Sequence, residues 1–142
     1  MILLDTNVIS EMMRPAPAPA VMQWLDARPE SDFWISAVTK AEIRLGIALL
    51  NDGKRKSLLL ELAEQMFRED FSDQCLPFDC DAARRYAHIV AARHRLGRPI
   101  SVEDAQIASI AQAGGLTLAT RNTKDFLDID ELDIVNPWVD IS

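Results

Sequence analysis

Four acidic side chains are placed along the chain so that they could share one chemical site. They are Asp5, Glu42, Asp104 and Asp125, and each follows an expected strand or lies near the start of an expected helix. In a parallel α/β sheet such junctions gather at one edge, where clustered carboxylates repel one another unless a cation lies between them. Oxygen ligands without histidine or cysteine favour Mg²⁺ or Mn²⁺ over zinc. A site of this kind is suited to metal-assisted hydrolysis of phosphodiester bonds.

The first carboxylate follows the most apolar short stretch near the N-terminus. Residues 2–4 are three consecutive large aliphatic residues, a pattern that predicts a short strand covered on both faces. The strand runs directly into Asp5, Thr6 and Asn7, which it delivers to the edge where open α/β sheets bind ligands. Asp5 has a second possible role, because aspartate is also a preferred cap of a following helix.

The second carboxylate lies at the start of a predicted helix. Thr39 and Glu42 have the Thr-x-x-Glu spacing of a capping box, so we expect the helix to open at Thr39. Helical spacing places Glu42 on one face with Leu45, Gly46 and Leu49, and we expect that face to be buried. A carboxylate there is costly unless it is paired or bound to a cation. Gly46 costs roughly 1 kcal/mol relative to alanine within a helix, so we expect another group to approach closely beside Glu42.

The remaining carboxylates fall in the last third of the chain. Ser101 and Asp104 form a second start that resembles a capping box, and Asp104 shares a helical face with Ile107, Ala108 and Ala111. Residues 116–120 predict a strand, which is followed by Arg121, Asn122 and Asp125 in turn. We expect Asn122 to cap a short helix there.

The order of the elements predicts an α/β fold. Strands are expected at residues 2–4, 33–35, 116–120 and 134–135 and a short extended piece at 76–78, with helices at 8–13, 21–29, 39–50, 57–71, 81–96 and from 101. A strand, a helix and a second strand in succession indicate a parallel crossover. A chain of 142 residues is of single-domain size, so residues 1–142 are expected to form one domain.

Composition and charge exclude several classes of protein. The net charge of −7 argues against attachment to nucleic acid by overall electrostatics. Five arginines nevertheless lie between residues 82 and 102 without an acidic residue, namely Arg84, Arg85, Arg93, Arg95 and Arg98. Such a segment is either a solvated face or a surface for a polyanion. No apolar run is long enough to span a membrane, so we expect a cytoplasmic protein, and we assign no function to Cys75 and Cys80.

Five stretches in order resemble the PIN-domain family, and within it the VapC/FitB type of toxin ribonuclease from bacterial type II toxin–antitoxin systems. They are residues 2–7, residues 36–42 with Leu45 and Gly46, residues 101–108, residues 118–122 with Asp125 and Phe126, and residues 136–138. The resemblance covers essentially the whole chain. It implies a three-layer α/β/α domain with a mainly parallel sheet, an endoribonuclease activity that depends on Mg²⁺ or Mn²⁺, a cognate antitoxin and a homodimer.

The same resemblance implies roles for individual residues. The family's metal positions correspond to Asp5, Asp104 and Glu42. At the fourth acidic position this chain has Asn122, with Asp125 close behind it, and either could complete the site. Thr6 is implied to position Asp5 or a metal-bound water, or else to form a turn after the strand. The residues implied to contact RNA phosphates are Arg121, Arg95 and Arg98.

Two other functions remain open at this point. A PIN-like module without catalysis would bind RNA or a protein, and Asn122 is the feature that favours it. A phospho-acceptor domain of the receiver type is also small, acidic and α/β. Such a domain needs an adjacent acidic pair after its first strand and a lysine after a late strand, whereas Asp5 has no acidic neighbour and the late strand ends in Thr120 and Arg121.

Overall fold

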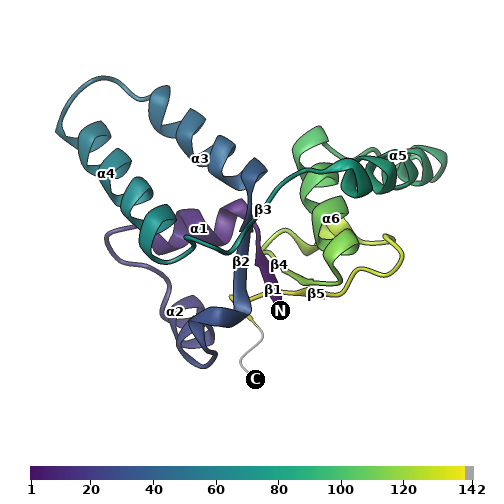
Figure 1. Cartoon of the computed structure of the whole chain (residues 1–142), viewed down its shortest axis with the longest axis horizontal. Coiled ribbons are helices and arrows are strands. Elements are labelled where there is room, and N and C mark those ends of the chain that lie inside the picture. The colour runs from purple at the N-terminus through teal and green to yellow at the C-terminus, as the bar shows by residue number, and fades with distance from the viewer. Residues whose placement is uncertain (140–142) are drawn as a thin grey trace.

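The computed structural model describes residues 1–139, which fold around a five-stranded sheet with helices on both faces (Figure 1). The strands are β1 (Ile2–Leu4), β2 (Phe33–Ser36), β3 (Cys75–Leu76), β4 (Thr117–Ala119) and β5 (Ile134–Val135). Their order is β3-β2-β1-β4-β5, and each neighbouring pair is parallel. The predicted parallel α/β sheet is therefore confirmed, with β1 at its centre.

The apolar sequence of β1 matches this central position. Leu3 pairs with Trp34 on one side and Leu118 on the other, and Leu3 and Leu4 are both fully buried. Leu4 belongs to a core that includes residues of the first four helices, whereas Leu3 belongs to a second core on the opposite face. Since successive side chains of a strand point to opposite faces, two separate cores give three layers. The expected α/β/α architecture is confirmed.

The helices divide between the two faces as Figure 1 shows, with α3 and α4 forming a hairpin on one side and α5 and α6 packing together on the other. The first group comprises α1 (Thr6–Met12), α2 (Pro19–Asp26), α3 (Ala37–Ala48) and α4 (Lys54–Glu69), and the second α5 (Cys80–Arg95) and α6 (Val102–Gly114). Two short 3₁₀ helices, η1 (Glu30–Asp32) and η2 (Thr123–Phe126), precede β2 and follow β4. No helix within residues 1–139 is both long and apolar enough to cross a membrane.

The start of α3 differs from the sequence prediction. Ser36, the last residue of β2, caps the helix, because its Oγ accepts the backbone N–H of Thr39 at 3.0 Å. The helix therefore begins at Ala37, and the predicted capping box of Thr39 and Glu42 is wrong. A capping side chain directly at the strand end places Thr39 within the first turn, where it is fully buried.

The predicted buried face of α3 is also wrong. Its buried residues are Thr39, Ile43 and Ile47, whereas Leu45 and Leu49 are 59% and 77% exposed. A Cβ added at Gly46 meets no described atom within 4 Å, so the close approach expected there is absent from residues 1–139.

The helix capping predicted in the last third holds for one of two residues. Ser101 caps α6, since its Oγ accepts the backbone N–H of Asp104 at 3.2 Å, as expected. Asn122 occupies the cap position of η2, but its side chain makes no capping hydrogen bond. The helix predicted at 57–71 begins earlier, at Lys54, and the one predicted at 81–96 begins at Cys80 after the cap Asp79.

Candidate active site

Three of the four predicted carboxylates line one pocket at the carboxyl edge of the sheet. Asp5 directly follows β1, Glu42 lies in the second turn of α3, and Asp104 lies in the first turn of α6. The pocket is also lined by Thr6, Asn7, Ser10, Glu11, Arg14, Arg121, Asn122 and Trp138. Parallel strands bring these junctions together because their carboxyl ends all face the same way. We call this the acid pocket.

Asp5 is the most buried of the three carboxylates, at 5% exposure. Its Oδ1 accepts the backbone N–H of Thr6 at 2.8 Å, and its Oδ2 accepts the hydroxyl of Thr120 at 2.7 Å and the amide of Asn7 at 3.3 Å. Burial raises the pKa of Asp5 to about 6, opposed by the hydrogen bonds from Thr120 and Thr6 and reinforced by the charges of Asp104 and Glu42. Asp5 thus caps α1 and lines the pocket at once, so its two possible roles are compatible.

Glu42 is held by a chain of hydroxyl groups. The Thr6 hydroxyl donates to Glu42 Oε1 at 2.6 Å and lies 3.0 Å from the hydroxyl oxygen of Thr39. Since a hydroxyl has one proton and that of Thr6 is used on Glu42, Thr39 must donate to Thr6. Ser36 Oγ donates to Thr39 Oγ1 at 3.4 Å and extends the chain to the end of β2. The hydroxyl of Thr6 therefore positions Glu42 and not Asp5, which receives only its backbone N–H.

Asp104 is half-buried, and the fourth acidic position divides between two residues. Burial raises the pKa of Asp104, and the charges of Asp125, Glu42 and Glu103 raise it further. Asp125 is exposed and does not line the acid pocket, although its charge acts on Asp104. Asn122 does line the pocket. The structure therefore places the neutral residue nearer to the site and the acidic one at its margin.

The acid pocket offers oxygen donors to a divalent cation, with no histidine or cysteine among the described residues of its lining. None of the ion pairs among residues 1–139 involves Asp5, Glu42 or Asp104, so none of these three carboxylates is directly paired with an arginine or lysine. Within the same residues, no group of three or more His, Cys, Asp and Glu side chains forms a ready-made metal site. Mg²⁺ usually takes one or two protein carboxylates and keeps several waters. The oxygen donors of the pocket fit a hydrated ion of this kind.

The predicted RNA-contacting arginines lie in different surroundings. Arg121 lines the acid pocket, with its backbone N–H donating to Asn7 Oδ1 at 3.3 Å. Arg98 forms an ion pair with Asp128, and Arg95 is exposed in the last turn of α5, and neither lines the pocket. Of the three, only Arg121 lies where a substrate at the carboxylates would meet it.

Sequence reasoning placed Asn7 at this edge of the sheet without giving it a role, and it missed two further polar residues that organise the pocket, Thr120 and Thr39. Thr120 and Asn7 hold Asp5 and also contact each other at 3.2 Å, and Thr39 supports Thr6. Thr120 ends the strand predicted at 116–120, which was a usable signal. Thr39 gave a misleading one, because its spacing to Glu42 imitates a capping box.

A larger groove opens beside the acid pocket. It has a volume of about 1070 Å³ and runs between α1, α3 and α4, with an apolar lining that includes Met12, Ile43, Leu58, Leu62 and Met66. The groove and the acid pocket share Thr6, Ser10, Arg14 and Glu42. A segment bound in the groove can therefore reach the carboxylates.

Comparisons with known proteins agree with this architecture. The profile described as PIN domain matches residues 2–132. The chain is 46% identical over 140 residues to Toxin FitB of Neisseria gonorrhoeae. The alignment covers 99% of this chain and 100% of that protein. It is 41% identical over 138 residues to VapC ribonuclease Y4jK of Sinorhizobium fredii, and the alignment covers 97% of this chain and 98% of that protein. A solved structure of FitAcB from Neisseria gonorrhoeae superposes with a TM-score of 0.90 at 45% identity and covers 98% of this chain and 99% of that one.

Proposed function

Because the chain belongs to the PIN-domain family, we propose that it is an endoribonuclease toxin of a toxin–antitoxin system that hydrolyses RNA with the help of Mg²⁺ or Mn²⁺. The observation that carries this proposal is the meeting of Asp5, Glu42 and Asp104 in one pocket, where none of the three forms an ion pair among residues 1–139. Family membership also removes the receiver-type alternative. The proposed site of action is the cytoplasm, where the RNA is found.

The side chains of the acid pocket have separable tasks in this mechanism. Asp5, Asp104 and Glu42 would hold the ion, which would supply positive charge to activate water and to offset the charge that develops on the phosphate. Thr120 and Asn7 fix Oδ2 of Asp5 and the backbone N–H of Thr6 fixes its Oδ1, whereas the chain from Ser36 to Thr6 fixes Glu42. Such hydrogen bonds hold ligands at the geometry the reaction needs. Asn122 and Asp125 are the two candidates for the fourth position.

The groove between α1, α3 and α4 is the proposed binding site of the cognate antitoxin. Its lining is largely apolar, which suits the apolar face of a peptide segment. The shared residues Thr6 and Glu42 place the carboxylates at the end of this groove. A guanidinium from the bound segment would pair with them and compete with the metal.

A homodimer is proposed from the exposed side of α3. Leu45 and Leu49 are one helical turn apart and are 59% and 77% exposed, opposite the buried Ile43 and Ile47. Exposed leucines on one helix face favour association. Light scattering on the wild type and on Leu45→Lys tests this, and a wild-type monomer would contradict it.

The catalytic proposal is tested by cleavage of a mixed RNA pool with the purified, antitoxin-free chain in Mg²⁺, Mn²⁺ or EDTA. We expect cleavage only with metal, and loss of cleavage in Asp5→Asn and Asp104→Asn. The matched control is Asp130→Asn, since Asp130 is exposed and its contact uses the backbone oxygen. Cleavage that persists in EDTA or in both site variants would overturn the proposal.

A second function is favoured by one observation, the neutral Asn122 at the pocket. A PIN-like module with a weakened metal site would bind RNA or a protein without cutting. Binding of RNA by the folded wild type without cleavage in any of the metals would support this alternative.

A further inference from the structure

The acid pocket carries basic and aromatic side chains besides its carboxylates. Arg14 and Arg121 line it together with Trp138, and both arginines are exposed. They come from distant parts of the chain. Arg14 follows the end of α1, Arg121 follows β4, and Trp138 lies in the turn after β5. We call these three residues the basic wall.

A buried carboxylate anchors the basic wall. Glu11 is 5% exposed, and its Oε2 accepts the backbone N–H of Ala18 at 2.9 Å while its Oε1 lies 3.3 Å from Arg14 Nη1. The Ala18 N–H lowers the pKa of Glu11 first, followed by Arg14 and by the charge of Arg121. Glu11 therefore stays ionised and lies close to both guanidinium groups. Two cations against one anion leave one positive charge at this part of the pocket.

The indole of Trp138 is held in position beside Arg121. The Arg121 guanidinium lies 5.0 Å from the centroid of the Trp138 ring, within the range of a cation–π contact. The backbone N–H of Trp138 donates to Asn136 Oδ1 at 2.9 Å, and Pro137 between them is fully buried. The turn that carries the ring is thus fixed by the protein, and the ring is only partly buried.

An arginine beside an aromatic ring is suited to nucleic acid that is not base-paired. The guanidinium contacts phosphate oxygens, and the ring offers a flat face on which an unpaired base stacks. In duplex RNA the bases are already stacked on each other and the ring cannot be used. The carboxylates of the same pocket repel phosphate unless a cation is bound, so the basic wall is where an RNA strand is attracted.

We propose that Arg14, Arg121 and Trp138 form a nucleotide subsite that holds the nucleotide next to the cleaved phosphate and selects unpaired RNA. The proposal rests on the proposed endoribonuclease function, which it makes more specific. Arg14 and Arg121 contact the flanking phosphate, and Trp138 stacks on its base. Arg95 at the end of α5 and Arg98 in the loop after it do not contact this nucleotide, because Arg98 is paired with Asp128 and neither arginine lines the pocket.

The test measures binding separately from cleavage. A short single-stranded RNA of mixed sequence is titrated into the Asp5→Asn variant, which leaves the RNA intact, and tryptophan fluorescence is followed in Mg²⁺. We expect quenching on binding, because a base stacks on Trp138. We expect the quenching to disappear in Asp5→Asn/Trp138→Leu, although Trp24 and Trp34 remain. The same sequence as a duplex should produce no quenching.

The arginines are tested by affinity and salt dependence in the same assay. Arg121→Gln should weaken the Kd about tenfold and lower the slope of log Kd against log salt by about 0.7, the loss of one phosphate contact with a single strand. The matched control is Arg84→Gln, whose guanidinium is exposed and paired with Asp81, and which should leave both quantities unchanged. Thermal melts establish that each variant is folded. Arg14→Gln, at the other exposed arginine, tests the phosphate contact independently through the same Kd and salt slope.

The outcomes separate this proposal from the proposed function. If the wild type cleaves RNA but Arg121→Gln and Trp138→Leu keep wild-type affinity, KM and salt slope, the subsite is wrong and the nuclease function stands. If RNA quenches Trp138 and Arg121→Gln weakens binding, but the wild type never cleaves, the subsite stands and catalysis is wrong. Equal quenching by the duplex would also contradict the subsite.

Discussion

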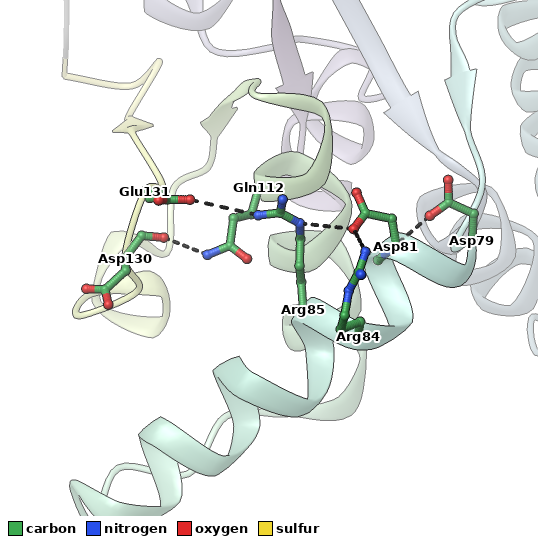
Figure 2. Close-up of polar contacts among 8 residues, drawn as sticks. Asp79, Asp81, Arg84, Arg85, Gln112, Asp130 and Glu131 are labelled. Atoms are coloured by element: carbon green, nitrogen blue, oxygen red, sulfur yellow. Dashed lines mark hydrogen bonds and ion pairs between the residues drawn. The ribbon is translucent and has the colours of Figure 1, made fainter.

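The two ends of α6 adjoin acidic residues that have different partners. Asp104 at its start joins Asp5 and Glu42 in the acid pocket, where no ion pair among residues 1–139 neutralises them. Gln112 near its end lies in a second polar cluster with residues of α5 and of the segment before β5 (Figure 2). There Asp81 is contacted by both Arg84 and Arg85, and Arg85 also reaches Glu131 at 3.9 Å.

The difference in partners shifts the pKa of the carboxylates in opposite directions at the two ends of α6. The hydrogen bond from Arg84 lowers the pKa of Asp81, whereas burial raises that of Asp5 to about 6. Asp79 in the same cluster accepts the backbone N–H of Ala82 at 2.9 Å and caps α5. Asp81 has arginine partners, whereas Asp5, Glu42 and Asp104 form no ion pair among residues 1–139 and are available to an external cation. The number of acids in a region does not indicate a metal site, but their partners do.

The largest expected effect follows from removing a carboxylate of the acid pocket. Asp104→Asn should lower RNA cleavage by at least about a hundredfold, because an ion loses a ligand where no other charge replaces it. Initial rates at several Mg²⁺ concentrations measure this. A cleavage rate within tenfold of the wild type would place the metal site elsewhere.

A smaller loss is expected from the hydroxyl that orients Glu42. Thr6→Val removes the donor that lies 2.6 Å from Glu42 Oε1 and should lower metal affinity or activity by about ten- to a hundredfold. Thr117→Val is the matched control, since Thr117 lies in β4, outside the lining of the acid pocket. Equal activity of the two variants would show that Glu42 needs no support from Thr6.

The raised pKa of Asp5 predicts a pH dependence of stability in the metal-free protein. A carboxyl whose pKa is about 6 when folded and 3.8 when unfolded binds more protons in the folded state between these values. Stability must therefore rise as the pH falls, by about 1 to 1.5 kcal/mol between pH 7.5 and pH 5. The difference between wild type and Asp5→Asn in urea unfolding with EDTA isolates this contribution, and a difference that does not change with pH would refute it.

The parts of this arrangement that the sequence predicts are those set by neighbouring residues. The apolar strand at 2–4 followed by Asp5, and the cap Ser101 before Asp104, depend on residues within a few positions of each other. The support of the site depends on contacts between distant residues. Thr120 and Asp5 are 115 positions apart, and Thr6 and Glu42 are 36 apart.

The same reason explains the error on α3 and why the partners of the arginines near α5 could not be predicted. Periodicity shows that α3 has an apolar stripe but not which stripe the sheet covers, and the structure buries Ile43 and Ile47 and exposes Leu45 and Leu49. A run of arginines in the sequence likewise shows that a segment is positively charged, but not which groups the guanidiniums contact. Arg93 is buried and donates to the backbone oxygens of Arg98, Asp125 and Leu127, which only the packing of α5 against that loop determines.

The smallest effect is expected at the second cluster, and it is the sharpest test of the comparison. Asp81→Asn removes an acid of the second cluster, yet RNA cleavage should stay within about twofold of the wild type because its charge serves Arg84 and Arg85, which do not line the acid pocket. Its stability should fall slightly at low ionic strength and match the wild type in high salt, where exposed ion pairs are screened. Melting curves at both salt concentrations and cleavage rates measure this. A large loss of cleavage in Asp81→Asn would mean that the two ends of α6 are coupled and that acids with partners also serve the reaction.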